Sequence, residues 1–86
     1  MAELIHEHMT HVRTPDGRIY LPRTYAAQQS DDVWEAWLEF VPINGGPALR
    51  TDRETSQATR EALETWASGL EASYFQGAFA RARLVD

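Results

Sequence analysis

The sequence predicts an α+β fold, in which an antiparallel three- to four-stranded meander is followed by one or two helices packed on one face. Three observations carry this prediction. Two turn signals divide the first part of the chain, the segment VWEAWLEFV alternates with a period of two, and the pattern after Ser56 changes to helical spacing. A run of strands followed by helices is typical of α+β domains.

Length and composition set the size of the core. We expect one small domain over residues 1–86, with residues 1–7 a candidate for disorder. Chains of this size bury only about 60–65% of their unfolded surface, so association with a second copy is a natural supplement. With 43% hydrophobic residues and three tryptophans, the chain still has enough apolar material to fold.

The segment THVRTPDGRIYL predicts the first hairpin. Pro15 presets the backbone angle φ, and Gly17 supplies a left-handed residue that closes the loop. Strands are therefore expected near His8–Arg13 and Arg18–Ala26. Pro22 interrupts the second strand, which predicts an edge position or a bulge there.

The segment VWEAWLEFV fits two conformations. In a helix, Trp34, Trp37 and Val41 would share one stripe. In a strand, Trp34 and Phe40 would share one face and Trp37 and Val41 the other. Nine residues make a marginal helix, and the aromatic and β-branched residues favour a strand, so we predict a strand.

The Asn44-Gly45 pair predicts a second hairpin, in which both turn residues take positive φ. Ala48–Glu54 is then the natural partner of the tryptophan strand. A two-residue loop sets Glu39 opposite Arg50. A loop longer by two residues would instead set Glu39 opposite Asp52, which is an unfavourable like-charge pair.

Two helices are expected after Ser56. In SQATREALETWASGL, Ser56 or Thr59 is the expected N-cap, and Gly69 is expected to end the helix in the left-handed conformation. Tyr74–Leu84 predicts a second helix with arginines near its C-terminal end. The apolar face of the first helix comprises Ala62, Leu63, Trp66, Ala67 and Leu70.

Composition excludes several classes of function. The chain has no cysteine, which excludes disulfides, thiolate catalysis and cysteine-ligated zinc. Its net charge is −5 and all eight basic residues are arginine, which argues against nucleic acid as a partner. The start MAELIHEHMT lacks the features of a signal peptide, and no stretch approaches the roughly 20 apolar residues of a membrane span. We therefore expect a cytoplasmic protein without membrane contact.

No catalytic residue, cofactor or metal site is predicted. The segment IHEHMTH does not have the zincin spacing, and neither strand nor helix brings His6, His8 and His11 together, so a solvated segment is expected. Glu35 and Glu39 share a strand face, but nothing there supplies the burial that acid–base chemistry needs. The glycines of INGGP form a turn and no phosphate loop. An enzyme is not expected.

The predicted strand leaves Trp37 on the face opposite the helices, beside Val41 and diagonal to Arg50. Arg50 and Glu39 either shelter the indole or form a contact surface with it, since Trp and Arg are enriched at interface hot spots. The candidate interaction surface is Trp37, Val41, Arg50 and Glu39. We expect a non-catalytic interaction module, a homodimer formed through this face. The alternative is an antitoxin-like protein partner or a weak RNA-binding module, the latter opposed by the acidic neighbours.

The motifs WEAWLEF, RETSQ and EALETWASGL resemble a family of small uncharacterised bacterial proteins. The resemblance covers Pro15 to about Arg83, and it implies no activity. The order of strands and helix is also loosely similar to the small domain of HicB-type antitoxins, which bind and mask a toxin. The glycine-rich strand motifs of those antitoxins are missing here, and no separate DNA-binding module follows.

Overall fold

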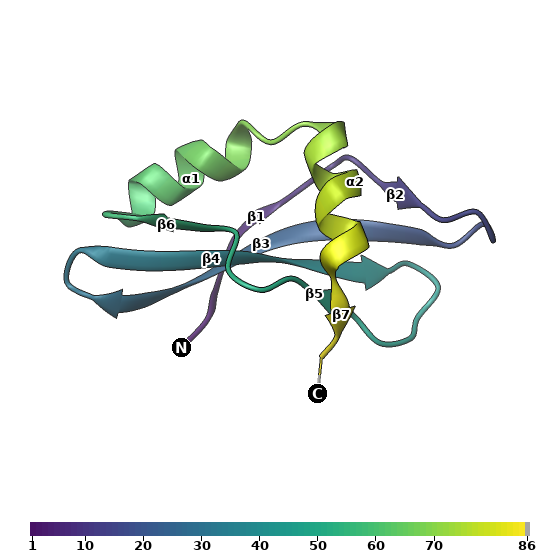
Figure 1. Ribbon diagram of the computed structural model, residues 1–86, viewed down its shortest axis with the longest axis horizontal. Coiled ribbons are helices and arrows are strands. Elements are labelled where there is room, and N and C mark those ends of the chain that lie inside the picture. Colours follow the sequence, from purple (N-terminus) through teal and green to yellow (C-terminus); the bar gives the residue numbers. More distant parts are fainter. Residues whose placement is uncertain (86) are drawn as a thin grey trace.

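The computed structural model describes residues 1–85, which form a twisted antiparallel sheet and two helices (Figure 1). The α+β class is confirmed, with seven strands in the described residues in place of the predicted three or four. The strands are β1 (Glu3–Glu7), β2 (Val12–Arg13), β3 (Ile19–Ser30), β4 (Val33–Pro42), β5 (Leu49–Arg50), β6 (Thr55–Gln57) and β7 (Arg83–Leu84), and the helices are α1 (Arg60–Ser68) and α2 (Ala72–Arg81).

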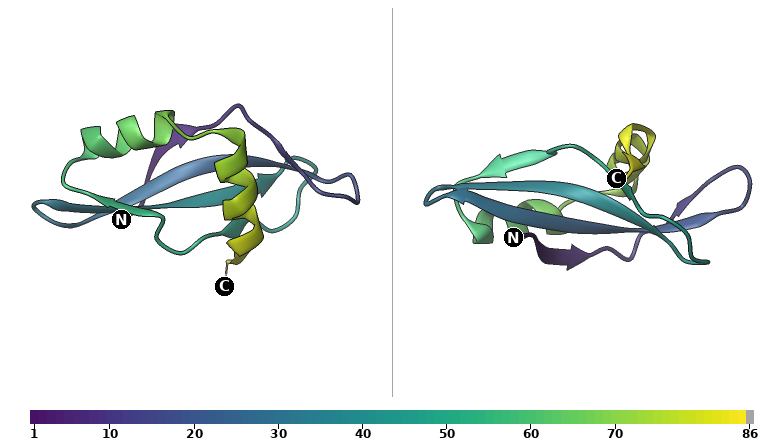
Figure 2. Two further views of the ribbon diagram at one scale, coloured as in Figure 1. Left: turned by 45° about the horizontal axis from the view of Figure 1, so that its top comes forward. Right: turned by 90° about the horizontal axis from the view of Figure 1, so that it is seen from below.

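The long hairpin of β3 and β4 is the centre of the sheet. The strand order is β1-β3-β4-β5-β7, with β2 paired to β3 and β6 paired to β4. Figure 2 shows the strong twist of this hairpin from two directions. The molecule measures 43 × 27 × 18 Å, so it is thin in one direction. No helix in residues 1–85 is long and apolar enough to cross a bilayer.

Alternation along β3 and β4 decides which side chains are buried under the helices. Leu38 and Phe40 are fully buried, and they share a cluster with Phe75 of α2. Ala36 belongs to a second cluster with Leu63 of α1. The strand interpretation of VWEAWLEFV is therefore confirmed, and both helices pack on the face that the even-numbered residues form.

The N-terminal segment, for which no strand was predicted, pairs with β3 as strand β1. Leu4 lies opposite Tyr25 and His6 opposite Thr24, so Ile5 is an extra residue in a bulge. The bulge lets Ile5 pack against the α1 cluster. A bulge breaks the period-two pattern, which explains why the sequence hides this strand.

The first hairpin has the predicted loop and a shorter first strand. Gly17 has a φ of 87°, and the Thr14 amide donates to the Arg18 carbonyl at 2.9 Å. The prediction for Pro22 is wrong, because β3 is an interior strand without a bulge at this residue. Proline is tolerated because Pro22 faces the gap between β1 and β2, where no strand needs a hydrogen bond from its nitrogen. Its carbonyl accepts a hydrogen bond from the His8 amide at 3.0 Å.

The second hairpin has the predicted register but a different turn. Glu39 lies opposite Arg50, as expected. The positive φ values fall on Gly45 and Gly46, and no non-glycine residue in 1–85 has one, so the two-residue Asn44-Gly45 turn is wrong. In this register Pro42 would face Pro47, and neither can donate a ladder hydrogen bond, so the strands separate before the turn.

Helix α1 begins where expected, helix α2 begins at Ala72 instead of the predicted Tyr74, and both helices end differently from the prediction. Thr59 is the N-cap of α1, and its hydroxyl accepts from the Ala62 amide at 3.1 Å. Gly69 has a φ of −92°, so the predicted left-handed end is wrong. Helix α2 ends at Arg81, because Ala82 is extended and the chain continues into β7 beside β5.

Candidate functional site

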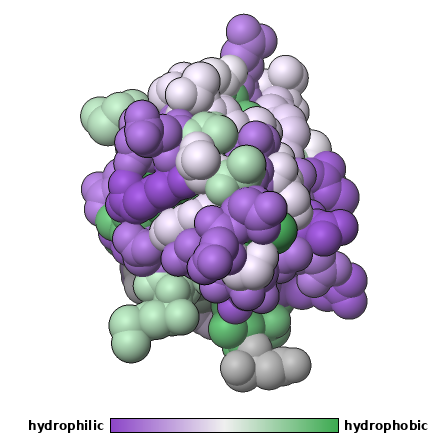
Figure 3. All heavy atoms as spheres, turned by 90° about the vertical axis from the view of Figure 1, so that its left-hand side faces the viewer, coloured by the Kyte–Doolittle hydropathy of each residue, from purple (hydrophilic) through white to green (hydrophobic). Residues whose placement is uncertain are grey.

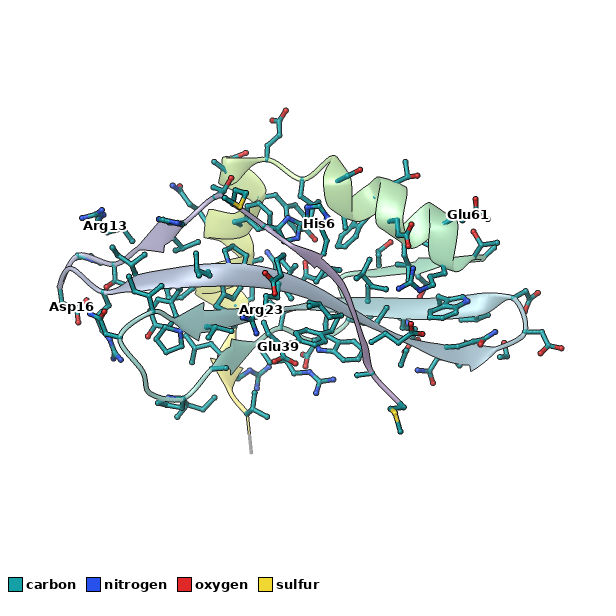
Figure 4. The ribbon with its side chains drawn as sticks, turned by 180° about the vertical axis from the view of Figure 1, so that it is seen from behind. His6, Arg13, Asp16, Arg23, Glu39 and Glu61 are labelled. Carbon is teal, nitrogen blue, oxygen red and sulfur yellow. The ribbon has the colours of Figure 1, made fainter. Side chains whose placement is uncertain are left out.

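A row of charged residues crosses the face of the sheet opposite the helices. Cross-strand pairing sets Glu7 beside Arg23, Arg23 beside Glu39, Glu39 beside Arg50 and Arg50 beside Arg83. We call these five residues the charged row. Figure 4 shows Arg23 and Glu39 near the middle of this face. The sign of charge alternates from β1 to β5, which favours pairing, and the alternation ends at β7.

Trp37 lies next to the charged row and supports two of its members. Its indole Nε1 donates to Glu39 Oε2 at 3.2 Å, and the Arg50 guanidinium carbon lies 4.2 Å from the ring centroid. The residue is only 8% exposed, although no helix covers it. Three of the four predicted surface residues therefore meet, with the indole below the two charged side chains.

Apolar residues flank the charged row on both sides. Val41, the fourth predicted residue, lies opposite Leu21, and both are half-buried. On the other side, Tyr25 lies opposite Trp37 and beside Leu4, which is 42% exposed. We call the charged row and these flanking residues the open face, because no helix in residues 1–85 packs on it.

A groove lies at the end of the charged row, where β5 and the segment that follows it meet β7. We call it the arginine groove; its volume is about 450 Å³. Arg83 lies 3.6 Å from Asp52 in a fully exposed pair, and Arg53 lies 3.2 Å from Glu35. Sequence reasoning missed Arg83, because the helical pattern of Tyr74–Leu84 placed it on a helix. The lining residues are Arg50, Thr51, Asp52, Arg53, Arg83, Leu84 and Val85.

His8 is a core residue, so the expectation of a solvated histidine segment is wrong for this side chain. His8 Nε2 lies 2.7 Å from the Thr24 hydroxyl, and its ring packs 4.6 Å from that of Phe75. Burial, and then repulsion from the nearby His6, lowers the pKa of His8 to about 4. Residues 1–85 contain no group of three or more side chains arranged to hold a metal ion.

A buried carboxylate joins the segment between β5 and β6 to α2. The Glu54 side chain is 7% exposed and accepts hydrogen bonds from Arg81 at 2.6 Å and from the Tyr74 hydroxyl. Burial, together with the hydrogen bond to Glu54, raises the pKa of Tyr74 to about 12. The tyrosine is therefore protonated at neutral pH, and the cluster fixes α2 against the sheet.

No family model, curated protein or solved structure matches this chain. The resemblance to small bacterial proteins and to HicB-type antitoxins stays a prediction from the sequence motifs.

Proposed function

We propose that this protein is a non-catalytic interaction module that forms a homodimer through the open face. The observation that carries the proposal is a sheet face that mixes apolar and charged residues and has no covering layer in residues 1–85. Val41, Leu21 and Tyr25 supply the apolar contact, and the charged row supplies orientation. An interface of this composition is typical of protein contacts, which combine aromatic and arginine residues.

A second copy of the chain suits this face because its charges are self-complementary. Glu39 and Arg50 lie side by side on neighbouring strands. In a twofold interface, Glu39 of each copy can face Arg50 of the other, because such contacts are reciprocal. A thin domain with a small core also gains stability from covering one side of its sheet.

Trp37 has a supporting role in this proposal. With 8% of its surface exposed, the indole does not project as an anchor. Instead it holds Arg50 against its ring and Glu39 through Nε1, which reduces the freedom that both charged side chains would lose on association. The same burial leaves too little free indole surface for stacking a nucleic-acid base, so RNA binding draws no support from Trp37.

The narrow end of the molecule is a poorer candidate for association. Figure 3 shows that hydrophilic side chains dominate the end at the left of Figure 1, with apolar ones scattered among them. The turn between β3 and β4 carries Ser30, Asp31 and Asp32, all exposed. Like-charged aspartates would repel one another in an end-to-end contact.

Sedimentation velocity over a concentration series tests the proposal. We expect a monomer–dimer equilibrium that Val41→Arg weakens by about tenfold or more, because it places an extra charge in the apolar part of the interface. Ala80→Arg is the matched control, since Ala80 is exposed on α2, away from the open face. A wild-type chain that stays monomeric at the highest concentration, or equal effects of both variants, would refute the proposal.

A further inference from the structure

The alternation of the charged row fails at one place, between β5 and β7. Arg50 and Arg83 lie directly opposite each other in the antiparallel pair. Like charges in such positions destabilise a sheet. Arg23, the other arginine of the row, has an acidic neighbour on both sides, Glu7 and Glu39, and it lies 3.9 Å from Glu7. The end of the row therefore lacks a negative group.

The carboxylates near this place do not supply that negative group. None of the ion pairs formed within residues 1–85 involves Arg50. Asp52 approaches Arg83 only to 3.6 Å, with both side chains more than 80% exposed. Such a pair is weak because water screens it. The arginine groove thus carries three arginines against one aspartate in a chain whose overall charge is −5.

The position of Arg50 prepares it to bind an anion. Its guanidinium lies over the Trp37 ring, with 4.2 Å between the central carbon and the ring centroid. Stacking uses the face of the guanidinium and leaves the N–H groups along its edge available. These N–H groups match the oxygen spacing of an oxyanion, which arginine binds through two parallel hydrogen bonds.

We propose that the arginine groove is a binding site for a phosphate group, with Arg50 and Arg83 as its ligands. A dianion between the two guanidinium groups restores the alternation of charge and removes their mutual repulsion. Arg53 lines the same groove, with part of its charge compensated by the ion pair with Glu35 at 3.2 Å. A groove of about 450 Å³ exceeds the volume of a phosphate ion, so the site can also take the phosphate group of a small phosphorylated molecule.

Titration of the ¹⁵N-labelled protein with inorganic phosphate at constant ionic strength tests the site. We expect saturable NMR shifts confined to residues 50–53 and 83–85, together with a change in the fluorescence of Trp37. Phenyl phosphate forms a second arm, since tighter binding of the ester than of the free ion would identify an organic phosphate as the ligand class. Shifts that rise linearly with phosphate, or that spread over all arginines, would overturn the proposal.

Two exposed residues of the groove provide variants with opposite expected effects. Arg83→Gln removes a ligand and should weaken phosphate binding about tenfold. Asp52→Asn removes the competing carboxylate and should tighten binding about threefold. Arg13→Gln and Asp31→Asn make the same charge changes at exposed positions outside the groove, and each should leave the dissociation constant within about twofold. Equal effects at both pairs of positions would indicate general charge attraction, and the proposal would fail.

The phosphate site does not depend on dimerisation, and the two proposals fail separately. The titration is repeated with Val41→Arg, which is expected to be monomeric and keeps all lining residues of the groove. Saturable binding in this variant supports the site whether or not the wild-type chain dimerises. A wild-type dimer that shows no saturable phosphate binding would remove the site and leave the dimer unaffected.

Discussion

The two faces of the β3–β4 hairpin are built from alternate residues of the same strands, and they differ in what surrounds a tryptophan or phenylalanine ring. On the helix side, Phe40 is fully buried among apolar groups, with the ring of Phe79 in edge contact at 5.2 Å. On the open face, Trp37 reaches 8% exposure with charged side chains as its cover. Burial of a ring therefore shows only that something covers it. The covering groups decide whether the residue belongs to the core or supports a surface.

The largest expected effect is a difference in unfolding free energy between substitutions on the two faces. Phe40→Ala should lower the free energy of unfolding by about 3–5 kcal/mol, because it leaves a cavity under α2. Tyr25→Ala, on the half-buried open face, should cost about half as much or less. Urea denaturation measures both. Similar losses at the two positions would show that the open face is as closely packed as the core.

The second effect concerns a polar group inside the helix-side core. The pKa of His8 falls from 6.5 to about 4 on folding, so the folded state favours the neutral ring. The contribution of His8 to the free energy of unfolding is therefore fully present above pH 6.5. It is lost as the pH falls toward 4, which lowers the free energy of unfolding by up to about 3 kcal/mol. The denaturation midpoint should depend much less on pH across this range in His8→Gln than in the wild-type chain. His11→Gln should keep the wild-type pH dependence, because the His11 side chain is exposed. An unchanged slope in His8→Gln would exclude His8 as the source.

The smallest effect sharpens the description of the open face. Arg83→Gln should stabilise the fold by about 0.5 kcal/mol at low salt, because it removes a like-charge pair with Arg50. The loss of its exposed pair with Asp52 offsets little of this gain. Thermal unfolding at low and high salt measures the effect, which should disappear as salt screens the charges. Destabilisation at low salt would mean that Arg83 is already compensated.

The sequence predicts the central strands well because their pattern has a clear period and a buried face. Glu39 opposite Arg50 followed from charge and loop length alone. Strand β1 could not be predicted, since the bulge at Ile5 interrupts the alternation. Strand β7 was also missed, because Ala82, Arg83 and Leu84 favour a helix and only pairing with β5 makes them extended.

Only part of the candidate site was predicted from the sequence. Trp37, Glu39 and Arg50 do lie together, as the period-two pattern indicates. The contribution of Arg23 depends on the register between β3 and β4, for which the sequence offers only the polar break at Ser30. The contribution of Arg83 depends on a pairing between segments more than 30 residues apart, which no local pattern encodes.

The bulge in β1 has a further consequence for how copies of this chain can meet. This strand ends the sheet, and an exposed sheet edge is a template that can recruit other chains into fibres. The bulge between Leu4 and His6 and the acidic side chains of Glu3 and Glu7 make this edge a poor partner for another strand. Aggregation by the addition of strands from other copies is therefore disfavoured at the β1 edge of the sheet.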